Sequence, residues 1–369
     1  MSAHGVHPTS LPWWSWLGPL ASLPLMASQT IPEIATGGLV WSMLATILLG
    51  VSVFAAVHHA EIIALKVGEP FGSILLAIAV TVIEVALIVS ILLSNAQGSE
   101  FVARDTVYSA VMIVLNGVIG LSLIAGGRLH HEQGFRSDGV AAALSVLGTL
   151  VTIALIFPNF THGIEGPYYT DHQLLFVGAV SLILYGIFIF VQTIRHRDYF
   201  ADITSAEDGE IESHSLPSTK TTLLSGVLLI LSLIMVILLA KGLSVPLNAA
   251  IAWAGLPAGF LGVVIAMVVL LPESVASLRA AIANKIQSSL NLAIGSAIAS
   301  IGLTIPTVAI FSVLMHKSLP LGLPPQDMIL LVLTLFISTL TLGSGRTNVL
   351  HGAVHLVIFG IFVFIAAVP

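Results

Sequence analysis

The sequence has no cysteine and very few charged residues, which make up 8% of its 369 positions. Without cysteine, the chain can form neither disulfide bonds nor thiolate metal sites. It also lacks a cluster of basic residues, so nothing supports nucleic-acid binding. A soluble domain carries about 25% charged residues, whereas 57% of this chain is hydrophobic. The composition therefore indicates an integral membrane protein, whose partner is the lipid bilayer.

The N-terminus has no lysine or arginine ahead of its first apolar stretch, which is not the pattern of a cleavable signal peptide. Trp13, Trp14 and Trp16 stand at the start of that stretch. Tryptophan is enriched at membrane–water interfaces, so we interpret these three side chains as interfacial anchors.

Long apolar segments follow one another along the chain. A helix needs about 20 such residues to cross the hydrocarbon core. Eleven segments approach this length and predict an all-α polytopic membrane protein, although Pro19 and Pro24 interrupt the first one. The predicted spans are 12–29, 38–57, 71–93, 106–126, 138–157, 173–194, 221–241, 258–283, 288–313, 327–343 and 349–368.

Lysine and arginine are distributed unevenly between the two sides that this span count defines. Cytoplasmic loops of membrane proteins carry an excess of these residues. We therefore expect a cytoplasmic N-terminus and a C-terminus on the outer side of the membrane. The N-terminal side holds Lys66, Arg128, Arg136, Arg195, Arg197, Lys220, Arg279, Lys285 and Arg346, and the opposite side holds Arg104, Lys241 and Lys317.

One substantial hydrophilic loop, 195–220, contains six acidic residues. Segments of this kind usually form solvated linkers, and a low-affinity cation sensor is the alternative. The loop separates two sets of five spans, and a duplicated unit with an odd number of spans must enter the membrane in opposite directions. Inverted repeats are the architecture of many secondary transporters. The predicted parts are an extra N-terminal helix (1–33), a first five-helix repeat (34–194), the acidic loop (195–220) and a second repeat (221–369).

Two carboxylates lie inside predicted spans, Glu84 in the third and Glu273 in the eighth. A charged group within a membrane helix is costly, and it usually faces a cavity and marks an ion or proton pathway. The alternative is a structural hydrogen-bonded pair. Two close carboxylates titrate as a coupled pair, and a bound cation would displace their protons. Pro272 precedes Glu273 and removes a backbone donor beside it.

Several motifs resemble the calcium/cation antiporter superfamily, in particular the cation/proton exchanger branch and its ChaA-type sodium/potassium/calcium–proton antiporters. The resemblance covers nearly the whole chain. It implies one extra helix plus two inverted five-helix repeats, and it matches Glu84 and Glu273 with the family's paired ligand glutamates. The motifs are GEPFGSILLAIAVTVIEVALI (68–88), LIAGGRLHHEQGF (123–135), LPESVASLRAAIANKIQSSLNLAIGSAIASIGLTIP (271–306) and GSGRTNVLHGAVHL (343–356).

The sequence departs from the exchanger pattern Gly-Asn-Ala-x-Glu before both glutamates. The asparagine is replaced by Thr81 in one repeat and by Leu270 in the other. Losing amide oxygens lowers the number of hard ligands, and Ca²⁺ prefers six to eight oxygens. We therefore expect monovalent cations, or Ca²⁺ only weakly.

Small polar residues near the glutamates are candidates for neutral ligands or for lining the ion path. Gly295-Ser296 matches the family's Gly-Ser pair. Ser289, Ser296 and Ser300 fall close to a common stripe, because residues four apart share a helix face. The alternative is that these small side chains let membrane helices pack closely. The candidates are Thr81, Ser109, Asn116, Asn291, Ser296 and Ser300.

His351 and His355 lie four residues apart on the last span. Three readings remain open: a packing role, a proton-linked role, and two ligands of a zinc site. No His-Glu-x-x-His run accompanies them, which disfavours a zinc enzyme. The pairs His58-His59 and His130-His131 are expected in short solvated loops.

These features predict a non-enzymatic antiporter without a cofactor. It would exchange cytoplasmic Na⁺, K⁺ or Ca²⁺ for H⁺ by alternating access, with Glu84 and Glu273 as the cation and proton ligands. The alternatives are a proton-independent channel or uniporter on the same fold, an intramembrane metal-dependent enzyme and a membrane scaffold.

Overall fold

The computed structural model describes residues 11–28, 38–68, 71–93, 98–202 and 216–368. Its helices are α1 (Trp13–Ser28), α2 (Leu39–Val67), α3 (Phe71–Leu92), α4 (Val102–Met112), α5 (Ile119–His130), α6 (Ser137–Val151), α7 (Asp171–Phe190), α9 (Thr219–Trp253), α10 (Phe260–Ile282), α11 (Ile286–Met315), α12 (Pro325–Leu342) and α13 (Val349–Ala367). Short turns of 3₁₀ or π helix extend them: η1 (Ser99–Phe101), η2 (Ile113–Val118), η3 (Thr152–Ile156), η4 (Phe157–Phe160), η5 (Val191–Arg195) and η6 (Arg197–Phe200). Two strands, β1 (Gln133–Gly134) and β2 (Arg346–Thr347), complete the elements.

The prediction of an all-α polytopic membrane protein is confirmed. Among the described residues, ten helical runs are long and apolar enough to cross a membrane, and one of them joins η1, α4, η2 and α5 into a continuous run from Ser99 to His130. α1 is helical but has only 16 residues. An eleventh crossing and the inverted repeats therefore stay predictions.

Two helices extend well beyond the predicted spans. α2 runs to Val67 instead of residue 57, and α9 runs to Trp253 instead of residue 241. The predicted spans end where polar residues lower the hydropathy. A helix ends only where the backbone leaves the helical conformation. α2 stops at Gly68, whose φ of 77° is a conformation that favours glycine.

The expectation that His58 and His59 lie in a solvated loop is wrong, because both belong to α2 and are buried. The ring of His59 has no exposed surface, and its Nε2 lies 3.0 Å from the carbonyl oxygen of Ser15 on α1. The ring of His58 packs against Trp14, with 5.2 Å between the ring centroids. These polar side chains therefore join α1 to α2.

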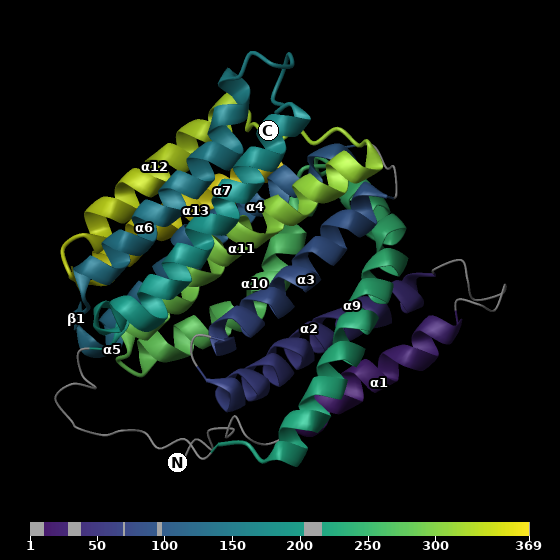
Figure 1. Ribbon diagram of the computed structural model, residues 1–369, viewed down its shortest axis with the longest axis horizontal. Helices are drawn as coiled ribbons and strands as arrows, with labels where there is room; N and C mark the ends of the chain where they lie inside the picture. Colours follow the sequence, from purple (N-terminus) through teal and green to yellow (C-terminus); the bar gives the residue numbers. More distant parts are fainter. Residues whose placement is uncertain (1–10, 29–37, 69–70, 94–97, 203–215, 369) are drawn as a thin grey trace. The chain divides into compact units, whose positions relative to one another are not determined.

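The chain divides into two compact units, whose helices are labelled in Figure 1. Unit 1 consists of α1, α2, α3 and most of α9, and unit 2 consists of α4 to α7 and α10 to α13. Each unit takes helices from both halves of the chain. The predicted part boundaries follow chain order instead, and they stay predictions.

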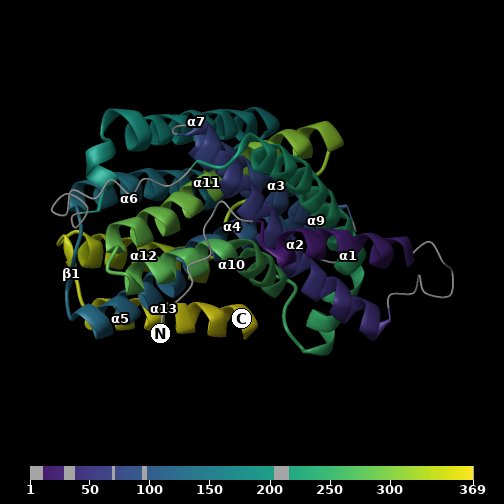
Figure 2. The same ribbon diagram turned by 90° about the horizontal axis from the view of Figure 1, so that it is seen from below.

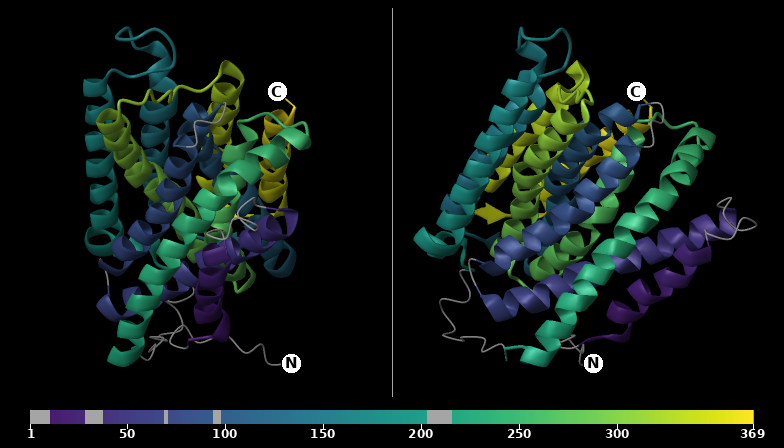
Figure 3. Two further views of the ribbon diagram at one scale, coloured as in Figure 1. Left: turned by 90° about the vertical axis from the view of Figure 1, so that its right-hand side faces the viewer. Right: turned by 45° about the vertical axis from the view of Figure 1, so that its right-hand side comes forward.

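In unit 1, α1 packs against α2, and α2 packs against α3 (Figure 3). The hydroxyls of Ser22 and Ser52 lie 3.4 Å apart across the first of these contacts. At the second contact a Cβ on Gly72 would lie 2.7 Å from the carbonyl oxygen of Ala64, so only glycine permits this approach.

In unit 2, α7 packs along α11, α4 along α10 and α5 along α13; Figure 2 shows the last pair side by side. The α4–α10 approach is close, because a Cβ on Gly262 would lie 2.5 Å from the backbone of Asp105. At one end of the unit β1 pairs with β2 in antiparallel register, with Gln133 opposite Thr347.

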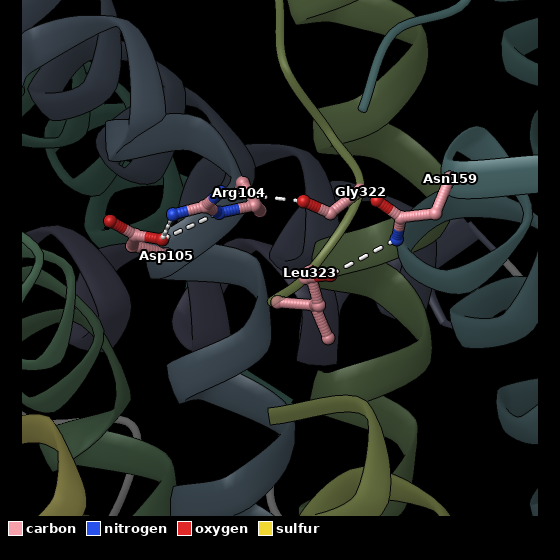
Figure 4. Close-up of polar contacts among 5 residues, drawn as sticks. All are labelled: Arg104, Asp105, Asn159, Gly322 and Leu323. Atoms are coloured by element: carbon pink, nitrogen blue, oxygen red, sulfur yellow. Dashed lines mark hydrogen bonds and ion pairs between the residues drawn. The ribbon is translucent and has the colours of Figure 1, made fainter. Parts of the chain in front are cut away.

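At the opposite end of unit 2, polar contacts hold the segment between α11 and α12 (Figure 4). Arg104 donates to the carbonyl oxygen of Gly322 at 3.3 Å and pairs with Asp105 at 2.8 Å. Asn159 donates to the carbonyl oxygen of Leu323 at 3.0 Å. Two side chains from distant parts of the sequence thus fix this connection.

Tyr169, which lies between two spans, also supports this end. Its hydroxyl donates to the carbonyl oxygen of Ile153 at 2.6 Å. Burial raises the pKa of Tyr169 to about 12, so the hydroxyl keeps its proton at neutral pH.

Candidate functional site

Glu84 lies in the interior of α3 in unit 1, and only 2% of the residue is exposed. Thr81 lies three residues earlier on the same helix face and is also buried. The Thr81 hydroxyl donates its proton to the carbonyl oxygen of Ala77 at 2.8 Å. Its oxygen retains lone pairs that can accept a hydrogen bond or contact a cation. α3 therefore presents a carboxylate and a neutral oxygen on one face.

Glu273 lies on α10 in unit 2 and is partly buried. α10 remains helical through Pro272. Because proline has no N–H, it cannot donate to the carbonyl of Val268 as an ordinary helical residue would. Ser274 donates its hydroxyl to the carbonyl oxygen of Leu270 at 2.6 Å. The expected loss of a backbone hydrogen bond beside Glu273 is therefore present without a break in the helix.

A serine cluster lies one turn beyond Glu273. It joins Ser289, which the sequence analysis placed on a helix stripe, to two serines that the sequence analysis did not single out, Ser277 and Ser122. The hydroxyl of Ser277 is 2.9 Å from that of Ser289 on α11 and 3.4 Å from that of Ser122 on α5. All three residues are almost fully buried. For Ser277, the signal in the sequence was its spacing of four from Glu273, which places both residues on one helix face.

The side chain of Asn291 forms hydrogen bonds with backbone and side-chain groups of the protein itself. Its Nδ2 donates to the carbonyl oxygen of Phe200 at 2.6 Å, and its Oδ1 accepts from Gln287 at 3.0 Å. The neighbouring Ser288 donates its backbone N–H to Asp202 at 3.2 Å, and its hydroxyl donates to the same carboxylate. These contacts fix the first residues of the acidic loop to the start of α11, so we do not propose Asn291 as a ligand.

Asn116 belongs to a fully buried network built from three elements. It lies in the π-helical turn η2, and its Nδ2 donates to the Thr334 hydroxyl on α12 at 3.0 Å. Its Oδ1 lies 3.3 Å from Nδ1 of His355 on α13. Nε2 of His355 lies 2.8 Å from the Thr341 hydroxyl. Both ends of the Asn116 amide are used within the protein, so we do not propose it as a ligand either.

The remaining candidates occupy different environments. Ser109 on α4 and Ser300 on α11 are buried, and Ser296 is half-buried. His351 lies one turn before His355, and its backbone N–H donates to Oδ1 of Asn348, which caps α13. Among the described residues, no three His, Asp or Glu side chains gather into a group that could hold a metal ion.

Glu84 and Glu273 belong to different units. Their predicted convergence on one site therefore stays a prediction. What the structure describes is a carboxylate with a neutral oxygen in unit 1, and a carboxylate beside a proline and a buried serine cluster in unit 2.

Comparison with known proteins identifies the class of this chain. The profile of the sodium/calcium exchanger protein family matches residues 37–194 and 224–368. The chain belongs to this family and is a multi-pass membrane antiporter of ions.

Within the family, the chain falls in the ChaA-type branch. It is 33% identical to the sodium-potassium/proton antiporter ChaA of Escherichia coli, over 91% of this chain and 90% of the relative. It is 51% identical to a putative ionic transporter, y4hA, of Sinorhizobium fredii, over 99% and 98% of the two chains.

Solved structures share the fold at low sequence identity. The structure of native YfkE has a TM-score of 0.73 at 18% identity, covering 96% of this chain and 100% of that one. The structure of the H⁺/Ca²⁺ exchanger CAX has a TM-score of 0.67 at 17% identity, covering 95% and 88%.

Proposed function

We propose that this protein exchanges cytoplasmic Na⁺, K⁺ or Ca²⁺ for H⁺ by alternating access, with Glu84 and Glu273 binding both the cations and the protons. The observation that carries the proposal is the burial of Glu84, a carboxylate that is 2% exposed in the interior of a membrane-crossing helix. Such groups are costly and typically serve ion or proton pathways. The family and the E. coli antiporter at 33% identity support the same conclusion.

The exchange follows from competition for the same oxygens. A carboxylate binds either a proton or a hard cation, and two coupled carboxylates release protons as a cation enters. Net exchange then needs only a site that opens to one side of the membrane at a time. No separate coupling group is required for this basic step.

Neutral oxygens near the carboxylates set the cation preference. Thr81 offers a hydroxyl oxygen on the face of Glu84, and Pro272 leaves the carbonyl of Val268 without its usual helical donor. Ser296 and Ser300 on α11 are further candidates to line the path. This set offers few hard ligands for Ca²⁺, which prefers six to eight oxygens. We therefore propose that monovalent cations are transported more effectively than Ca²⁺.

The surrounding medium in this proposal is the bacterial inner membrane, with the N-terminus in the cytoplasm. The exposed face of α9 is strongly apolar at helical spacing, which fits contact with lipid. It includes Leu223, Val227, Ile230 and Ile234.

Cation-induced proton movement in everted membrane vesicles tests the proposal. A ΔpH-sensitive dye would be followed while Na⁺, K⁺ and Ca²⁺ are added separately, for the wild type, Glu84→Gln and Glu273→Gln at equal expression. We expect the cations to collapse ΔpH in the wild type and in a control variant, Glu165→Gln, whose side chain is exposed. Neither membrane-glutamate variant should respond.

The same vesicles distinguish a channel or uniporter from an antiporter. If tracer cations cross the membrane while ΔpH stays constant in the wild type, the exchange mechanism is wrong and a proton-independent pathway takes its place. If both glutamate variants exchange cations as well as the wild type, the two-carboxylate site is wrong.

A further inference from the structure

Thr106 on α4 and Thr304 on α11 are two buried polar residues of unit 2 that the proposed exchange site does not use. Neither residue has any exposed surface. In the part of the chain that the structure describes, neither hydroxyl has a hydrogen-bond partner. Buried hydroxyls are nearly always hydrogen-bonded, because an unpaired polar group is costly to remove from water. Two unpaired hydroxyls in one unit are therefore unusual.

The helices that carry these threonines do not use the two hydroxyls either. A threonine in a helix often donates its hydroxyl proton to the carbonyl oxygen four residues earlier. Thr307, one turn after Thr304 on α11, forms such a bond with Leu303 at 2.7 Å. Thr106 and Thr304 form no bond of this kind. Their oxygens, with lone pairs and a proton each, are available to a ligand.

Thr106 lies directly beside Gly262 on α10. A Cβ on Gly262 would lie 2.7 Å from the backbone nitrogen of Thr106, so α4 meets α10 at this point. α4 also packs against α11. Thr106 is therefore buried where α4 meets α10, on a helix that also contacts α11.

Thr304 lies at the same level of the unit. α10 and α11 are consecutive helices that run in opposite directions, and the hydroxyls of Ser277 and Ser289 connect them at 2.9 Å. Gly262 precedes Ser277 by 15 residues, and Thr304 follows Ser289 by 15 residues. Equal distances from the same contact place Thr304 opposite Gly262, the residue that Thr106 also adjoins.

Thr304 is on the face of α11 that is directed at α10. Ser289 defines this face through its contact with Ser277. Ser300 and Thr304 follow Ser289 by 11 and 15 residues, which are close to three and four turns of about 3.6 residues each. Both threonines are therefore buried at the region where α4, α10 and α11 come together.

Further hydroxyls continue from the two threonines toward Glu273. Ser109 on α4 and Ser300 on α11 are each about one turn nearer to Glu273, and both are buried. Glu273 itself lies about 16 Å beyond the level of the threonines, since a helix rises by about 1.5 Å per residue. In the other direction, α4 begins at the ion pair of Arg104 and Asp105, on the predicted outer side of the membrane. The threonines thus lie between the outer end of unit 2 and the proposed ligand.

We propose that Thr106 and Thr304 bind the transported monovalent cation on the outer side of Glu273, at a second position along the ion path. Neutral oxygens can replace part of the hydration shell of Na⁺ or K⁺. Polar groups buried within membrane helices typically line such pathways, and a path that leads to a carboxylate favours cations over anions. This inference rests on the proposed antiporter function, because it extends the path of that same site.

Valine variants test the two hydroxyls, because valine keeps the shape of threonine without the oxygen. Uptake of ²²Na⁺, and of ⁸⁶Rb⁺ in place of K⁺, would be measured in right-side-out vesicles, which expose the outer face. For Thr106→Val and Thr304→Val, we expect the half-saturating cation concentration to rise about tenfold. Thr304→Ser retains a hydroxyl and should recover most of the affinity. Thr307→Val is the matched control on α11, because Thr307 is exposed and bonds to its own helix.

Everted vesicles, which expose the cytoplasmic face, test the placement of the site. A cation that enters from the cytoplasm reaches Glu273 without first passing the threonines. The valine variants should therefore weaken cation affinity less at this face than at the outer face. Equal weakening at both faces would contradict a site on the outer side of Glu273.

Melting temperatures of the purified full-length protein give a readout that does not depend on transport. A cation that binds the folded state raises its stability. Replacing choline chloride by NaCl at equal ionic strength should raise the melting temperature of the wild type and of Thr307→Val, and should raise that of the two threonine-site variants less. The measurement in choline also identifies any variant that fails to fold.

The two readouts separate this inference from the proposed function. If Na⁺ stabilises the wild type more than the valine variants, but the wild type exchanges no cation for protons, the proposed function fails and the cation site stands. If exchange is normal, and valine at either position raises the melting temperature in choline without changing cation affinity or the effect of Na⁺, the hydroxyls are only unpaired polar groups. That result would overturn the proposal.

Discussion

The hydroxyl of Ser277 lies 2.9 Å from the hydroxyl of Ser289, so α10 is joined to α11 one turn beyond Glu273. Ser277 also donates toward the carbonyl oxygen of Ser289, at 3.1 Å, and lies within 3.4 Å of Ser122 on α5. Three helices therefore meet at one buried serine. This contact fixes the part of α10 that follows the proposed carboxylate ligand, and its removal should affect both stability and exchange.

Ser277→Ala removes the central hydroxyl of this cluster. Hydrogen bonds between membrane helices contribute about 0.6 kcal/mol each on average, so we expect the free energy of unfolding to fall by about 1 kcal/mol. The rate of exchange should fall as well, because Glu273 loses its fixed support. Thermal unfolding in detergent and the vesicle assay measure the two effects. Ser145→Ala is the matched control, since Ser145 is exposed on α6. Equal losses in the two variants would contradict this role of Ser277.

Thr81→Val tests the neutral oxygen beside Glu84. Valine keeps the shape of threonine but loses the oxygen, and we expect the apparent affinity for the transported cation to fall about tenfold, the equivalent of about 1.4 kcal/mol. Thr81→Ser keeps the oxygen and should retain most of the affinity. The measurement is the cation concentration that gives half-maximal ΔpH collapse.

The control for Thr81→Val is Thr46→Val on α2, where the threonine also donates to the carbonyl four residues earlier but is exposed. An unchanged cation affinity in Thr81→Val would remove Thr81 from the set of proposed ligands and leave Glu84 without this neighbour.

The membrane spans and their two carboxylates are readable from sequence because each depends on local composition. An apolar run long enough to cross the bilayer predicts a helix, and a glutamate within it is rare enough to attract attention. The ends of the helices were harder to predict from the sequence. Residues 58–67 and 242–253 are too polar or too irregular for a hydropathy signal, yet the backbone continues helically through them.

Polar side chains inside the bundle were the hardest to place from the sequence. His58 and His59 suggested a solvated loop because histidine can carry a charge. In the structure both are buried against α1, which supplies a carbonyl oxygen for His59 and an aromatic ring for His58. Ser277 gave no signal beyond its spacing from Glu273, because its partners come from helices far away in the sequence. Asn291 gave a signal, but the acceptor it binds, the carbonyl of Phe200, is visible only in three dimensions.

Gly352→Ala tests the close packing of α13 on α5. A Cβ at Gly352 would lie 2.7 Å from the carbonyl oxygen of Gly120 and 2.7 Å from the side chain of Ile124, so the backbones would have to separate. Overpacking of this kind costs about 1–3 kcal/mol, and we expect the melting temperature to fall. Gly360→Ala on the same helix is the matched control, because no atom lies within 4 Å of its added Cβ. That variant should be neutral or slightly stabilising, since alanine favours helix more than glycine does.

A result in which both glycine variants lose stability equally would show that α13 does not depend on the contact with Gly120. Because His355 lies three residues after Gly352, the ¹⁵N spectrum of His355 in Gly352→Ala gives a second readout. A shifted α13 should change the His355 signals, and Gly360→Ala should not.

Asp202→Asn tests the attachment of the acidic loop to α11. The Asp202 carboxylate accepts from the backbone N–H and the hydroxyl of Ser288, in the first turn of the helix, where an anion also interacts favourably with the helix dipole. Loss of a capping interaction costs about 0.5–2 kcal/mol. We therefore expect faster hydrogen exchange at the Ser288 amide and at the amides next to it, with little change near the middle of α11. Asp198→Asn, in the same segment, is the matched control, because Asp198 contributes no side-chain cap to α11. If the two variants show the same protection at Ser288, the Asp202 carboxylate does not hold the start of α11, and the hydrogen bond from Asn291 to the Phe200 carbonyl remains as an attachment of the loop.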